Sequence, residues 1–439
     1  MKARLVPLSL PRKDDAFDAQ LQILNELLGD EAEFLDPVPL GSSMPEADAV
    51  IFPQMLGDVY RMIGEFKKID LPILVITSEF GTVMMWDWEI VYFLRSKGIQ
   101  AIAPYNLDQS RKLCKALQAK RQLQGGKFVV FQDDPGEGFQ AEIFKRFYWW
   151  EGEHDQRMKD KFGITIEKRS FKELGEKAKK IPDAQAKAAA NNHDIPARDL
   201  SESALSSALK MYVAIKDEID GDDSIRSVGI NCLNESRYSD TTPCLAWNLL
   251  FMDDELIWGC EADTLSMLTK FLLYKALGSP LMMTNIYPFL MGMAALKHER
   301  IPNFPEIVEE PENHVLLAHC GYLGVLPQCF ATDWVVTEKV LAIVDDNAHA
   351  LDARLPSGPA TMAKVGPSLE NIVVTEGTLK GYVQYSGSDC RNGAVLKVPN
   401  GHRLVTDINS HHQILMSGHW ARDIELVSKI YGLGLEMVE

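Results

Sequence analysis

Short apolar segments alternate with helical patterns through the first third of the chain. The apolar segments predict buried strands at residues 49–52, 73–77, 99–103 and 128–131. Between them, residues 56–66 and 88–97 repeat their apolar positions at helical spacing. Strands that alternate with helices predict a parallel, doubly wound sheet. We therefore expect a Rossmann-like α/β domain over residues 1–168.

A segment rich in Lys, Glu and Ala comes next, and residues 191–196 interrupt its helical pattern. After this segment the alternation of helices and strands begins again. It begins with a long helix, which is predicted at residues 201–218. Strands are predicted after it at residues 227–231, 255–260, 281–288 and 314–324. A second doubly wound α/β domain is expected over residues 169–333.

The last part of the chain, residues 334–439, lacks long helices until its end. Strands are predicted at residues 340–344, 361–365, 371–374, 381–385, 394–398 and 402–407. The dipeptide Asn400-Gly401 is typical of a hairpin turn, because it readily takes the positive φ that such turns need. This pattern predicts a C-terminal antiparallel β module, barrel-like, that a helix over residues 422–430 follows.

Composition narrows the class of protein. A chain of 439 residues has room for two or three domains. Its net charge of −17 disfavours nucleic acid and anionic membranes as partners, because both need a basic surface. The seven cysteines show neither CxxC nor zinc-knuckle spacing, as expected of reduced thiols. With no signal peptide and no bilayer-spanning apolar segment in the sequence, we expect a soluble cytoplasmic protein.

Two carboxylates, Glu261 and Asp263, stand where a predicted strand turns into a helix that begins at Thr264. In α/β proteins, sites are built at this end of a strand. A structural interpretation is equally direct: Asp263 is a good N-cap, and Glu261 has a favourable place near the positive end of the helix dipole.

A long polar loop, residues 232–244, follows the strand at residues 227–231. It contains Glu235, Arg237, Tyr238 and Asp240. A loop of this length and composition at the end of a strand contributes little to packing and is suited to binding.

The C-terminal segment carries a family resemblance. A His411-His412 pair, an apolar run and then Gly418-His419 resemble the C-terminal end of the L-fucose isomerase and L-arabinose isomerase superfamily. Residues 261–265 (Glu-Ala-Asp-Thr-Leu) resemble the Glu-x-Asp-Ser-Leu of L-fucose isomerases, and residues 316–321 are similar to a family segment that precedes its β domain.

The resemblance implies a metal-dependent aldose–ketose isomerase that uses Mn²⁺ or another divalent cation and is a homo-oligomer, a trimer or a hexamer. By position, Asp263 and His412 would be metal ligands. The family also has a glutamate that serves as ligand and base, but its position falls near residues 243–244 of this chain, where neither residue can act. Glu235 is the expected substitute, with Asp240 and Glu261 as alternatives.

Such an enzyme moves a proton between C1 and C2 of a sugar through a cis-enediol, with a divalent ion polarising the carbonyl. We expect Glu235 and Asp263 to be the catalytic residues, and the site to lie at a domain interface. The candidates for binding sugar hydroxyls are Arg237, Tyr238, Asn285, Tyr287, His319, Asp389 and His419.

Two other classes of function fit the same residues. A metal-dependent lyase or epimerase acting on a sugar or polyol would bind metal without aldose–ketose exchange. A non-catalytic sugar-binding protein would keep its ligand after chelation. The presence of both Asp263 and His412 favours the isomerase.

Overall fold

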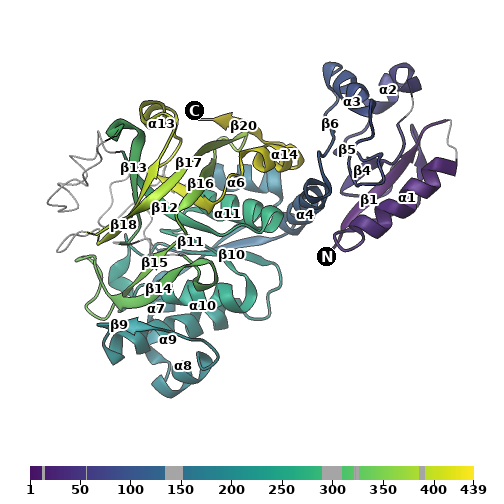
Figure 1. Ribbon diagram of the computed structural model, residues 1–439. Coiled ribbons are helices and arrows are strands. Elements are labelled where there is room, and N and C mark those ends of the chain that lie inside the picture. Colours follow the sequence, from purple (N-terminus) through teal and green to yellow (C-terminus); the bar gives the residue numbers. More distant parts are fainter. Residues whose placement is uncertain are drawn as a thin grey trace. The chain divides into compact units, whose positions relative to one another are not determined.

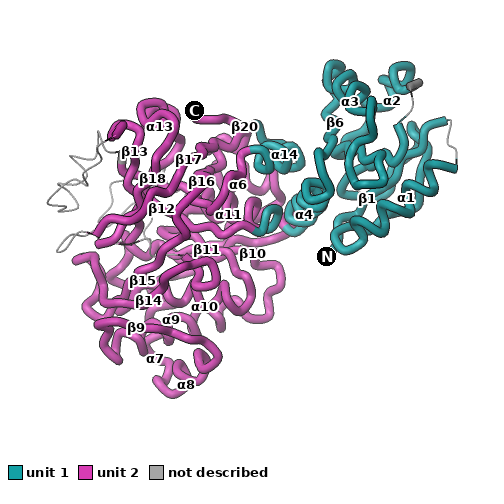
Figure 2. Tube along the Cα trace, in the orientation of Figure 1, with its two compact units in different colours: residues 1–122, 275–278, 422–434 teal, residues 123–274, 279–421, 435–439 magenta. Residues whose placement is uncertain are grey.

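The computed structural model describes residues 1–11, 15–55, 57–133, 152–288, 309–320, 322, 326–384 and 391–439. It is a mixed α/β structure that divides into two compact units (Figure 2). Unit 1 comprises residues 1–122, 275–278 and 422–434, and unit 2 comprises residues 123–274, 279–421 and 435–439.

Unit 1 is built on a parallel, Rossmann-like sheet with the order β2-β1-β4-β5-β6, and β3 pairs with the end of β1 (Figure 1). Its strands are β1 (Ala3–Ser9), β2 (Ala32–Phe34), β3 (Val38–Pro39), β4 (Ala49–Phe52), β5 (Ile73–Val75) and β6 (Ala101–Ile102). The strands predicted at residues 49–52, 73–77 and 99–103 are confirmed, with shorter limits for the last two.

The helices of unit 1 are α1 (Asp15–Leu28), the 3₁₀ helix η1 (Gly57–Arg61), α2 (Ile63–Phe66), α3 (Asp87–Ser96), α4 (Leu107–Leu123) and α14 (Ala421–Tyr431). The C-terminal helix α14 returns to this unit and is held to α4 by polar contacts. Lys112 Nζ lies 2.9 Å from Asp423 Oδ2, and Lys120 Nζ donates to the carbonyl of Ile430 at 3.0 Å.

Unit 2 contains a second parallel sheet, with the order β11-β10-β7-β8. Its strands are β7 (Lys127–Phe131), β8 (Thr165–Arg169), β10 (Ile225–Ile230) and β11 (Ile257–Cys260). The helices of this unit are α6 (Gly152–Phe162), α7 (Phe171–Lys180), α8 (Asp183–Ala189), α9 (Glu202–Ile219), α10 (Cys244–Asp254) and α11 (Thr264–Leu277), the last of which ends in unit 1. Within the described ranges, no helix is both long and apolar enough to cross a membrane.

Six antiparallel strands of unit 2 close into a barrel, because β16 pairs with both β19 and β17 in the order β16-β19-β12-β13-β18-β17. The strands are β12 (Leu281–Pro288), β13 (His314–Ala318), β16 (Gly358–Val365), β17 (Asn371–Gln384), β18 (Asn392–Lys397) and β19 (His412–Ser417), with β20 (Gly434–Met437) beside β17. The predicted barrel-like module is therefore present, and it also takes β12 and β13 from the segment before residue 334.

Two strands predicted in this part of the chain are wrong. Residues 402–407 form a helix, α13 (Gly401–Asp407), because the Asn400 side chain caps it by accepting from Arg403 N at 3.0 Å instead of forming a hairpin turn. Residues 340–344 lie in the connection between β14 (Asp333–Glu338) and β15 (His349–Arg354), and their apolar side chains line a pocket. β14 also pairs with β9 (Ala197–Arg198).

His349, at the start of β15, makes the stability of unit 2 depend on pH. It is buried, and its Nε2 accepts a hydrogen bond from Leu245 N at 2.9 Å, which requires an unprotonated nitrogen. Burial lowers the pKa of His349 from its ordinary 6.5 to about 3. Between these two values the unfolded chain binds one more proton than the folded chain, so stability falls as the pH is lowered.

Below pH 6.5, the difference in proton binding at His349 should lower the free energy of unfolding by roughly 1.4 kcal/mol for each pH unit. Urea unfolding at pH 5.5 and 4.5, which both lie between the two pKa values, measures this slope. The His349→Gln variant keeps an acceptor for Leu245 N but does not titrate, so its slope should be smaller than the wild-type slope by that amount. Equal slopes in the two proteins would contradict the assignment.

Candidate metal centre

Four polar side chains from three separate segments of the chain meet inside unit 2. Glu261 and Asp263 lie in the loop between β11 and α11, His319 follows β13, and His412 opens β19. None of the four is more than 3% exposed. We call these residues the acid–histidine cluster.

The register of the barrel explains why the two histidines are neighbours. Asn285 of β12 pairs with Ala318 on one side and with His412 on the other. His319, one residue beyond Ala318, therefore lies near His412 across β12. Their ring centroids are 5.8 Å apart, edge to face.

Asp263 is the N-cap of α11. Its Oδ1 accepts a hydrogen bond from Ser266 N at 2.8 Å, and its Oδ2 accepts from Ser266 Oγ at 2.9 Å. The capping interpretation of Asp263 is therefore confirmed. This cap fixes the carboxylate at the first turn of the helix.

The same carboxylate also binds two groups from the barrel. Asp263 Oδ2 lies 2.9 Å from His412 Nδ1 and 2.7 Å from Lys364 Nζ, and the side chains of all three residues are fully buried. Burial raises the pKa of Asp263, but the charge of Lys364 and the hydrogen bond from His412 hold it well below its usual range. A proton on Nδ1 of His412 leaves its Nε2 as the nitrogen that can bind an ion.

Glu261 stands on a strained turn. It and Ala262 both have left-handed backbones, with φ of 53° and 56°, which side chains other than glycine rarely adopt. Such strain is concentrated at functional sites. Glu261 Oε1 lies 3.7 Å from His412 Nε2. Burial raises the pKa of Glu261, but His412 and His319 lower it to about 2, so the carboxylate is charged.

His319 completes the group. Its Nδ1 lies 3.2 Å from Asn285 Oδ1, which places a proton on that nitrogen. Its Nε2 is buried and has no hydrogen-bond partner among the residues that the structure describes. A buried nitrogen without a partner is costly unless something else binds it.

Glu261, His319 and His412 each offer one donor atom, and these atoms lie within 4.8 Å of one another. One carboxylate and two imidazoles suit a first-row divalent ion such as Mn²⁺ or Fe²⁺. Asp263 stands behind His412 and fixes its orientation, an arrangement that is common around metal-bound histidines.

Glu235 is fully buried in a different network. Its two carboxylate oxygens accept from Asp133 N at 3.1 and 2.9 Å, and Oε1 also accepts from Asn231 Nδ2 at 3.0 Å. It therefore ties β10 to the end of β7. Among the described residues it is not a member of the metal-binding group. Asp240, the other alternative, accepts from Ser207 Oγ at 3.0 Å.

Only some of the residues predicted to bind sugar hydroxyls lie at the acid–histidine cluster. Asn285 joins the cluster, and its Nδ2 lies 3.4 Å from the hydroxyl of Tyr287. Arg237 is exposed and lies over the ring of Tyr238, and His419 Nδ1 is 3.4 Å from Glu376 Oε2 at a half-exposed position. Asp389 lies outside the described residues.

Two members of this site were missed from sequence. Lys364 is the next-to-last residue of β16, in its buried part, and a lysine between apolar neighbours in a strand was the available signal. His154 of α6 approaches the start of α11, with Nε2 3.3 Å from Thr264 Oγ1. No sequence signal identifies His154.

Comparison of the sequence with protein-family models gives no match, and comparison with curated proteins gives no significant similarity. The side chains themselves must therefore carry the inference of function.

Proposed function

We propose that the protein is a metal-dependent aldose–ketose isomerase acting on a small-molecule sugar. The observation that carries this proposal is the buried Glu261–His319–His412 group, with His412 oriented by Asp263. The short segments that resemble fucose and arabinose isomerases include Glu261, Asp263, His319 and His412, which supports the same reaction.

The residues present fit a divalent ion. Two ligand atoms bound at about 2.0–2.2 Å lie roughly 3–3.6 Å apart, close to the 3.7 Å between Glu261 Oε1 and His412 Nε2. The buried Nε2 of His319 supplies a third donor. A bound divalent cation would polarise the sugar carbonyl and stabilise negative charge as the cis-enediol forms.

The remaining roles follow from charge and contact. Asp263 holds His412 in one tautomer, and Lys364 balances the charge of Asp263. Because Glu261 belongs to the metal-binding group and Glu235 does not, we assign proton transfer between C1 and C2 to Glu261. This choice replaces Glu235 by one of its alternatives.

The test is hydrogen exchange at C2. Pentoses, hexoses and deoxyhexoses are incubated with protein and Mn²⁺ in D₂O, the ion is removed with chelator, and proton NMR records loss of the C2–H signal. We expect one class of sugar to exchange, and His412→Gln to lower exchange below detection because it removes a ligand.

His411→Gln is the matched control, because its ring lies 4.2 Å from that of His412 but it is not in the metal-binding group. It should keep most of the exchange. Exchange that persists in the His412→Gln variant, or in the absence of any metal, would contradict the proposal. Ion binding without exchange of any sugar would favour a lyase or an epimerase.

A further inference from the structure

Four thiols with unremarkable spacing in the sequence gather at one edge of the parallel sheet in unit 2. Cys232 follows β10, Cys260 ends β11, Cys244 opens α10, and Cys320 follows His319 after β13. Because β10 and β11 are parallel neighbours, with Ile230 opposite Cys260, the first two thiols must leave the sheet at the same end. We call Cys232, Cys244, Cys260 and Cys320 the thiol cluster.

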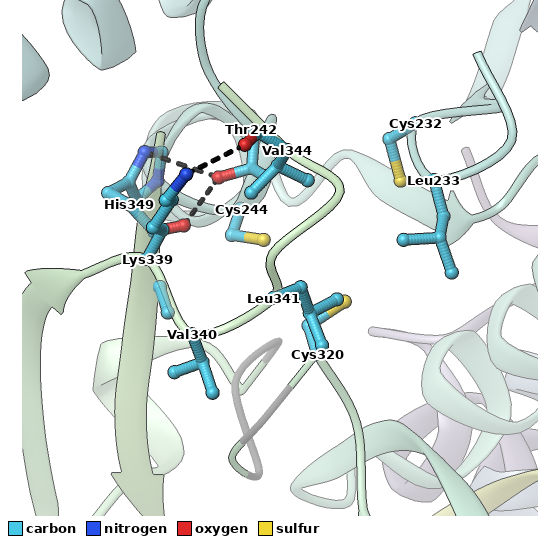
Figure 3. Close-up of a pocket in the computed structure, with 11 residues that line it drawn as sticks. Cys232, Leu233, Thr242, Cys244, Cys320, Lys339, Val340, Leu341, Val344 and His349 are labelled. Carbon is cyan, nitrogen blue, oxygen red and sulfur yellow. Dashed lines mark hydrogen bonds between the residues drawn. The ribbon is translucent and has the colours of Figure 1, made fainter. Parts of the chain in front are cut away.

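The thiols are close to one another. Cys232 Sγ and Cys260 Sγ are 3.8 Å apart, and the thiol of Cys320 interacts with those of Cys244 and Cys260. Figure 3 shows Cys232, Cys244 and Cys320 around one pocket. Cys232, Cys244 and Cys260 are buried and Cys320 is partly exposed.

One subset is compact enough to hold an ion. Cys260, Cys320 and His319 each offer one donor atom, all within 4.8 Å of one another. Four sulfur ligands about 2.3 Å from a tetrahedral Zn²⁺ ion lie about 3.8 Å apart. The Cys232–Cys260 separation has this value, but Cys232 is not in the group whose donor atoms all lie within 4.8 Å of one another, so the site rests on three donors.

Two further observations indicate that a ligand belongs here. Within the described part of the chain, the buried Nε2 of His319 has no nitrogen or oxygen partner, and the His319 side chain interacts with the thiol of Cys320. Cys320 has a left-handed backbone, with φ of 52°, the conformation that already marks Glu261 and Ala262. Thiolates select soft cations such as Zn²⁺ and Cu⁺ over Mn²⁺ or Mg²⁺, so this donor set differs in kind from the carboxylate group beside it.

We propose that Cys260, Cys320 and His319 form a binding site for a thiophilic cation such as Zn²⁺. Binding deprotonates the thiols and releases their protons to solvent. His319 belongs to both donor groups, so its Nε2 serves one ion at a time. A thiophilic ion therefore takes His319 away from Glu261 and His412.

Cadmium is the probe, because its bonds to thiolate absorb in the ultraviolet and need no substrate for detection. Cd²⁺ is titrated into the full chain with a phosphine reductant present, so that the thiols stay reduced. We expect sulfur-to-cadmium absorption that saturates at one ion per chain. Cys320→Ser and Cys260→Ala should each weaken binding by at least about tenfold.

Two cysteines away from the cluster provide controls. Cys329 is exposed and Cys114 is buried in α4 of unit 1, so Cys329→Ser and Cys114→Ala should leave the absorption unchanged. Glu261→Gln should also leave it unchanged, which separates this site from the proposed isomerase centre. The proposal fails if the wild type gives no absorption at stoichiometric Cd²⁺, or if the absorption survives both cluster substitutions in variants whose circular dichroism is native.

Discussion

Asp263→Asn is expected to destabilise the protein by roughly 3–5 kcal/mol, because it leaves a fully buried lysine without its counter-ion. The amide can still cap α11 through its oxygen, but it no longer neutralises Lys364. Burial then acts unopposed and lowers the pKa of Lys364 further. In this variant the folded protein binds the Lys364 proton less tightly than the unfolded chain does. The loss of stability should therefore grow as the pH is lowered.

A second substitution tests the cause. Lys364→Met in the Asp263→Asn background removes the unpaired charge, and part of the lost unfolding free energy should return, as measured by urea unfolding. Asp423→Asn is the matched control: it breaks the partly exposed Lys112–Asp423 pair and should cost no more than about 1 kcal/mol. If Asp263→Asn is as mild as Asp423→Asn, Lys364 does not carry a charge in the folded protein.

The fold could be predicted from sequence where burial imposes a clear period. β4 and residues 128–131 of β7 are continuous apolar runs that are buried throughout, as expected of strands covered on both faces. The helix at residues 401–407 was missed because a short segment with Asn-Gly before it fits a hairpin as well as a capped helix. Sheet membership was not readable either: β7 pairs with β10, a partner far along the chain.

All four residues of the acid–histidine cluster were candidates from sequence, but the lysine that pairs with Asp263 was not. Glu261, Asp263 and His412 carried recognisable local patterns, whereas Lys364 meets Asp263 from a position 101 residues away. The thiol cluster had no local signal at all, because its members reach one sheet edge only through the pairing of β10 with β11 and the closure of the barrel. Spacing rules for cysteine sites detect ligands on a single turn, not ligands that topology brings together.

Glu261→Gln should lower the rate of C2–H exchange by roughly 10²–10⁴-fold, the range expected when a general base is lost. The change is nearly isosteric and removes the charge from the carboxylate that lies 3.7 Å from His412 Nε2. Exchange is measured in D₂O as above, and Mn²⁺ affinity is measured separately by electron paramagnetic resonance of the free ion. Rates compared at saturating Mn²⁺ then report proton transfer rather than occupancy of the site.

Glu235→Gln is the natural comparison, because Glu235 is an equally buried glutamate whose oxygens bind Asp133 N and Asn231 Nδ2. This variant should have a free energy of unfolding that is lower by on the order of 1 kcal/mol, because it loses a hydrogen bond. Its exchange rate at saturating Mn²⁺ should fall by far less than the roughly 10²-fold expected of a base. The opposite ranking, with exchange retained by Glu261→Gln and lost in a folded Glu235→Gln, would return the base to Glu235. In that case Glu261 would act as a ligand alone, and the substrate would have to reach across to the end of β10 for its proton to be removed.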